Sequence, residues 1–174
     1  MSAICLYFQI HQPFRLKRYR FFDIGNDHYY YDDFSNEEIL TRIAQHSYLP
    51  ANELLLDMIK SSNKKFKVAF SISGTAIEQF QRFMPEFLES LKKLVATGCV
   101  EFISEPYAHS LAALTDIDEF RRQVELHNQL IYTEFGQKPK VFKNTEFVYN
   151  DEIAAYIADM GYKAVLTEGA KHIL

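Results

Sequence analysis

Short apolar runs alternate along this chain with longer stretches in which apolar residues recur every three or four positions. The runs cover residues 3–10, 66–72, 100–104, 141–142 and 163–167. They are brief, almost continuously apolar and rich in strand-forming residues, a composition typical of strands buried on both faces. Strands separated by helices need crossover connections, so the alternation predicts an α/β fold with a parallel sheet.

The stretches between the runs predict helices with recognisable ends. Helical spacing of apolar residues covers three of them, 36–61, 75–97 and 118–135. Breaks are expected at Pro50 and near Pro85, because proline lacks the N–H that a helix needs. Gly98 and Gly136 follow the second and third stretches, where helix-ending glycines stand. We expect Asn150 to cap a last helix.

One connection, residues 14–35, is long and aromatic and has no clear period. A loop of this length in a compact domain usually has a function or is covered by another part of the protein. No closing helix follows the fifth run. We therefore expect residues 1–174 to be a single domain that forms the N-terminal portion of a longer barrel, with about five of its strands.

Charge and hydropathy narrow the possible partners. The formal net charge is −4 and no long basic block occurs, so nothing supports a nucleic-acid partner or an anionic membrane. No apolar run reaches membrane-spanning length, and the N-terminus lacks a signal-peptide pattern. A soluble, cytoplasmic protein is expected. The two cysteines, Cys5 and Cys99, lie in apolar runs and are expected to be buried structural thiols.

Polar and ionisable residues gather where the expected strands end. The candidate site residues are His11 and Gln12 after the first run, Glu101 within the third, Tyr107 and His109 after the third, and Asn144 and Glu146 after the fourth. The carboxyl ends of parallel strands meet at one face, so these side chains should lie close together. Paired carboxylates suit glycosyl transfer, and imidazole, amide and phenol groups suit sugar hydroxyls.

Each candidate also has a structural interpretation. A single histidine after a strand commonly bonds to its own loop, and Glu146 alone could be an exposed loop acid. Glu101 is flanked by apolar residues and must face water or find a partner. No second imidazole lies at helical spacing from His109, so a metal site is not expected, and no cofactor is called for.

Three motifs in this order resemble glycoside hydrolase family 57, specifically its α-amylase-type members. They are His11-Gln12-Pro13, Gly98-Cys99-Val100-Glu101 and Asn144-Thr145-Glu146. The resemblance implies an incomplete (β/α)7 barrel and a retaining mechanism on α-1,4-glucans. It makes Glu146 the nucleophile, and it places His11, Glu101 and His109 around the sugar under attack.

The resemblance also implies a second carboxyl group. The family's general acid is an aspartate on a later strand, and no aspartate of this chain stands in the matching motif. Residues 1–174 alone are therefore expected to be inactive. Two alternatives stay open: a 4-α-glucanotransferase with the same nucleophile, and a glucan-binding module without catalysis.

Overall fold

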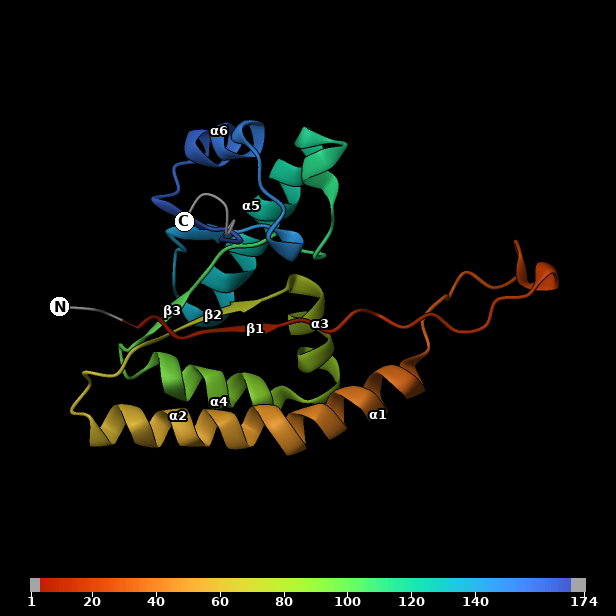
Figure 1. The fold of residues 1–174 in the computed structure, drawn as a ribbon. Helices are drawn as coiled ribbons and strands as arrows, with labels where there is room; N and C mark the ends of the chain where they lie inside the picture. Colours follow the sequence, from red (N-terminus) through yellow and green to blue (C-terminus); the bar gives the residue numbers. More distant parts are fainter. Residues whose placement is uncertain (1–3, 170–174) are drawn as a thin grey trace.

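The computed structural model of the protein describes residues 4–169, in which parallel strands are flanked by helices (Figure 1). The strands are β1 Tyr7–Ile10, β2 Val68–Ile72, β3 Val100–Phe102, β4 Val141–Lys143 and β5 Ala164–Leu166. One sheet has the order β1-β2-β3, and β4 pairs with β5. A parallel bridge between Ser104 and Phe142 links the end of β3 to β4.

Helices connect the successive strands, as parallel pairing requires. The α-helices are α1 Asp33–Ile43, α2 Leu49–Ser61, α3 Gly74–Phe83, α4 Pro85–Val95, α5 Ile117–Phe135 and α6 Asp151–Asp159. Short 3₁₀ turns are η1 Phe21–Asp23, η3 Ala112–Leu114 and η4 Thr145–Phe147. None of the helices within residues 4–169 is long and apolar enough to cross a membrane.

The predicted helix breaks have different outcomes at the two prolines. A π-helical turn, η2 Ala44–Tyr48, joins α1 to α2, and the Leu49 N–H donates to the Ala44 carbonyl five residues back. The chain therefore stays helical through Pro50, because the wider turn accommodates a residue without an N–H. At Pro85 the helix does break, and α4 starts at the proline itself, a favoured first position.

The predicted caps at Gly136 and Asn150 are confirmed, whereas α4 ends at Val95 with Ala96 as its C-cap, two residues before Gly98. Gly136 follows α5 with φ of 68°, a left-handed conformation that glycine adopts readily. The Asn150 side chain accepts a hydrogen bond from the Ile153 N–H at the start of α6.

Strand positions agree with the apolar runs, but the burial expected for β1 is wrong. Phe8 and Gln9 are exposed, because β1 pairs only with β2 among the described residues. Cys5 is likewise exposed, against expectation, whereas Cys99 is buried. Ala3, where the first run begins, lies outside the described residues.

The two faces of the strands differ in character. One face packs against the helices, where Phe102 stacks on Phe135 of α5 with ring centroids 4.4 Å apart, and Phe142 contacts Phe120. Because side chains alternate along a strand, Gln9, Ser71 and Lys143 point to the opposite face. That face is polar, and it leads to the ends of the strands where the site lies.

Residues 14–32, between β1 and α1, form an arm that extends away from the other helices (Figure 1, red to orange). It is a loose antiparallel hairpin, with a bridge between Leu16 and Tyr31. Its aromatic side chains are largely exposed, and Phe21 and Phe22 are 80% and 83% accessible. The predicted long connection is therefore present. Its own backbone bonds hold its two strands together, and Arg82 of α3 donates to the Tyr29 hydroxyl at 3.0 Å.

Candidate active site

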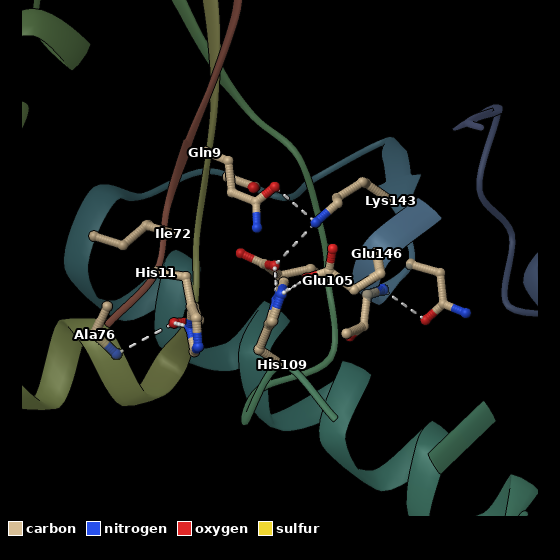
Figure 2. Close-up of polar contacts among 12 residues, drawn as sticks. Gln9, His11, Ile72, Ala76, Glu105, His109, Lys143 and Glu146 are labelled. Carbon is tan, nitrogen blue, oxygen red and sulfur yellow. Dashed lines mark hydrogen bonds and ion pairs between the residues drawn. The ribbon is translucent and has the colours of Figure 1, made fainter. Parts of the chain in front are cut away.

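The loops after β1, β3 and β4 bring two imidazoles and a carboxylate together (Figure 2). The His11 ring stacks on the His109 ring with centroids 4.2 Å apart and planes 24° from parallel. His109 Nε2 lies 3.2 Å from Glu146 Oε1. Three of the predicted site residues therefore meet at the carboxyl ends of three different strands.

Glu146 stands on a turn with an unusual backbone. Its φ and ψ are 50° and 26°, and the next residue, Phe147, also has a positive φ of 57°. Left-handed conformations are costly for residues other than glycine and persist where the surroundings enforce them, often at functional sites. The turn presents the Glu146 side chain to solvent, with 76% of its surface accessible.

Asn144 shapes this turn. Its side chain is buried, accepts a hydrogen bond from the Thr145 N–H at 2.9 Å and donates to the Val148 carbonyl at 3.0 Å. The oxygen and the NH2 group of its side-chain amide are therefore both bonded within the loop. The predicted substrate contact stays untested, and the observed bonds give Asn144 a role in holding Glu146 in place.

Behind His109 lies a buried pair of opposite charges, Glu105 and Lys143. Both side chains are almost fully inaccessible. Glu105 Oε2 is 3.2 Å from His109 Nδ1 and 4.0 Å from Lys143 Nζ. Lys143 also donates to Gln9 Oε1 at 2.9 Å. Buried charges need such partners, because isolated ions are expensive to remove from water.

The two stacked histidines titrate in opposite directions. The hydrogen bond to Glu105 raises the pKa of His109, with a further contribution from Glu146. Burial lowers the pKa of His11, and the neighbouring His109 lowers it further. His11 Nδ1 lies 2.8 Å from the Ser73 hydroxyl, a neutral partner that can donate or accept. Of the two stacked rings, His109 is therefore the one whose protonation is favoured.

Gln12 and Tyr107 lie in the same loops but bond to other groups. Gln12 donates to the Tyr48 hydroxyl at 3.4 Å and accepts from Arg15 at 3.2 Å. The Tyr107 hydroxyl donates to the Glu78 carboxylate, and its ring lies directly against Gly74, where a Cβ would be 2.4 Å from the ring. Among the described residues, neither side chain bonds to the imidazoles or to Glu146.

Glu101 lies away from this group. It pairs in register with Ala69 and lines an open hollow with Cys5, Lys67 and Gly98 at the amino-terminal end of the sheet. It shares a strand face with Glu105 but precedes it by four residues, about 13 Å along an extended chain. The structure therefore does not join Glu101 to the other predicted site residues.

Sequence reasoning gave no role to the buried Glu105 and Lys143. Glu105 does follow the third run, but its burial depends on Lys143, which is nearly forty residues later. Ser104 pairs with Phe142, and this pairing places the next residue of each segment, Glu105 and Lys143, on one face. Sequence alone does not reveal that register. His127 lies within the helical stretch 118–135, and no local pattern there marks it as a site residue.

His127 in fact supports the site from behind. It is fully buried, and its Nε2 lies 2.9 Å from the Ile72 carbonyl, which can only accept a hydrogen bond. Nε2 therefore carries the proton, and Nδ1 accepts from the Glu105 N–H at 3.5 Å. Burial lowers the pKa of His127, in keeping with a neutral ring. The ring ties the end of β2 to the loop after β3.

Within residues 4–169, no group of three or more histidine, cysteine or acidic side chains is arranged to hold a metal ion. The ring nitrogens of His109 face two carboxylates, and His11 Nδ1 faces a hydroxyl. The arrangement suits proton and hydrogen-bond chemistry at an exposed carboxylate.

Parallel strands that deliver such groups at their carboxyl ends define the class of barrel-like α/β enzymes. The model of glycosyl hydrolase family 57 matches residues 5–174. A curated protein of Methanocaldococcus jannaschii, named "Putative alpha-amylase", is 42% identical over 170 residues, 96% of this chain and 36% of that protein. The chain belongs to glycoside hydrolase family 57, and it spans about a third of that relative's length.

Solved structures agree on the fold. The 4-alpha-glucanotransferase of Thermococcus litoralis has a TM-score of 0.72 and 20% identity, covering 94% of this chain and 22% of that one. The alpha-amylase AmyC of Thermotoga maritima has a TM-score of 0.65 and 15% identity, and the match covers 96% of this chain and 40% of that one. The expected fold class, a parallel α/β fold in an incomplete (β/α)7 barrel, is confirmed.

Proposed function

We propose that this chain carries the nucleophile and part of the sugar-binding site of a retaining, α-amylase-like glycoside hydrolase that acts on α-1,4-glucans. One observation carries the proposal: Glu146 is an exposed carboxylate on a left-handed turn, directed toward two imidazoles at the carboxyl ends of the strands. An acid placed only for solubility needs neither that backbone nor those partners.

In the proposed reaction, Glu146 attacks the anomeric carbon of the bound sugar and the glycosidic oxygen leaves with a proton. The resulting glycosyl-enzyme is then hydrolysed by water, which restores the carboxylate and retains the anomeric configuration. His109 lies beside the carboxylate of Glu146, and His11, whose ring stacks on His109, can bond to sugar hydroxyls. Gln12, Tyr107 and Asn144 hold the loops that carry these groups.

The reaction needs a second carboxyl group about 5 Å from the nucleophile. Glu105 is unsuited, because it is fully buried and engaged by His109. We assign the proton donor to the aspartate that the family resemblance implies on a later strand. Glu101 lies away from Glu146 and the imidazoles and has no part in the proposed reaction.

Replacement of Glu146 tests the proposal in the full-length protein. E146Q should lower the release of reducing ends from maltooligosaccharides by about 10³-fold or more, since an amide is a poor nucleophile. The matched control is E152Q, which removes an exposed carboxylate at the start of α6. Near-normal turnover by E146Q would end the assignment.

The products of the wild-type protein separate the two alternatives. A 4-α-glucanotransferase would use the same nucleophile and form longer as well as shorter chains from one maltooligosaccharide. A hydrolase would form shorter chains only. Binding without any new product would indicate a glucan-binding module.

A further inference from the structure

His109 lies between two carboxylates, one on each side of its ring. Nδ1 is 3.2 Å from Glu105 Oε2, and Nε2 is 3.2 Å from Glu146 Oε1. An ionised carboxylate can only accept hydrogen bonds, and a neutral imidazole has one N–H. Two such contacts to ionised acids therefore require a proton on both ring nitrogens.

We propose that Glu105 is a positioning residue that holds His109 as an imidazolium, with Nδ1–H donated to Glu105 and Nε2–H donated to Glu146. The imidazolium thereby holds the carboxylate of Glu146 in one orientation, and we call this arrangement of Glu105, His109 and Glu146 the clamp. Glu105 acts through His109 and is too deeply buried to touch a substrate.

The charges around His109 balance in this state. Glu105 and Glu146 supply two negative charges, and Lys143 and the His109 imidazolium supply two positive ones. Glu105 Oε1 is buried and has no hydrogen-bond partner among the described residues, so this carboxylate depends on its two cations for stabilisation.

The remaining titratable neighbour is His11, whose ring stacks on His109 at 4.2 Å. Two stacked cations would repel each other, and burial together with His109 lowers the pKa of His11. Neutral His11 is therefore compatible with a charged His109. The pKa of His109 itself is raised by Glu105 first, and then by Glu146, against the effects of burial and of Lys143.

The loop that carries His109 is held in place by its surroundings. Its backbone φ is 53°, and its N–H donates to the Pro106 carbonyl at 3.0 Å. On the α5 side, Gln123 accepts from the Ala108 N–H at 3.2 Å, and His127 accepts from the Glu105 N–H. Glu105 thus has a fixed backbone from which to orient the ring.

One consequence rests on the proposed function. When His109 loses a proton, the hydrogen bonded to Glu105 is the one retained, because Glu105 is buried and Glu146 is solvated. Nε2 then directs a lone pair at the carboxylate of Glu146, which repels it. Activity should therefore fall as the pH rises through the pKa of His109.

NMR titration of the histidines in the full-length protein tests the clamp without any substrate. E105Q keeps an oxygen that accepts from Nδ1–H but removes the charge, so the pKa of His109 should fall by about 1 unit or more. The E152Q control should leave it within about 0.3 units of wild type. An equally small change in E105Q would overturn the proposal.

If E105Q does not fold, a measurement on the wild-type protein tests the proposal instead. Long-range ¹H–¹⁵N spectra above the pKa of His109 should show a proton on Nδ1 and none on Nε2. A neutral ring protonated on Nε2 would contradict the clamp. Neither NMR measurement involves glucan. The proposed arrangement around His109 and the proposed activity are therefore tested separately, and one can be contradicted without the other.

Discussion

The site loops and the aromatic arm are both irregular segments that follow or precede strands, yet they are held in opposite ways. The site loops are tied by buried side chains, including Glu105, Lys143 and Asn144. The arm is held by backbone bonds of its own and by exposed contacts, such as Lys17 with Asp27 within the arm and Arg82 of α3 with Tyr29. The comparison shows that buried side chains fix the geometry of the site, whereas the arm depends on its own backbone bonds and on exposed contacts.

The largest contrast concerns one lysine–carboxylate pair in each region, Lys143 with Glu105 at the site and Lys17 with Asp27 in the arm. K143M should lower the free energy of unfolding by about 3 kcal/mol, because it leaves the buried Glu105 with one cation fewer. K17M removes an exposed pair and should change stability little. Urea unfolding of both variants measures the difference, and equal effects would contradict the contrast.

A smaller contrast concerns two asparagines. N144A removes both bonds that close the turn under Glu146 and should cost about 1–2 kcal/mol. N26A removes one bond to the Phe22 carbonyl at the exposed tip of the arm and should cost far less. Thermal unfolding of the two proteins compares them. A smaller loss for N144A than for N26A would show that the left-handed turn does not depend on its amide.

The smallest expected effect is the pH dependence contributed by His109. Its pKa is raised in the folded chain, so its stabilising contribution is fully present below its unfolded pKa of about 6.5. The contribution is lost as the pH rises through the higher folded value. Urea unfolding of wild type and H109Q across this window should show the stability difference shrinking toward alkaline pH. A difference that grows with pH would have the wrong sign.

The fold and the location of the site were accessible from the sequence because they depend on local patterns. Apolar periods predicted the strands and most of the helix ends, and strand ends predicted where His11, His109 and Glu146 meet. These features follow from the short-range properties of each segment and from the common direction of parallel strands.

Features that depend on register were not accessible. The bridge between Ser104, just after β3, and Phe142 of β4 decides that Glu105 and Lys143 meet. The edge position of β1 likewise decides that Cys5 and Phe8 are exposed. No local pattern in the chain specifies which strand lies beside which.

The account depends most on Glu146 as the group that becomes bonded to sugar. Incubation of the full-length protein with a fluorinated α-glucosyl donor that stalls the glycosyl-enzyme, followed by peptide mass spectrometry, tests this directly. The account predicts one added sugar on the peptide that contains Glu146, absent in E146Q. A label on another residue, retained in E146Q, would contradict it.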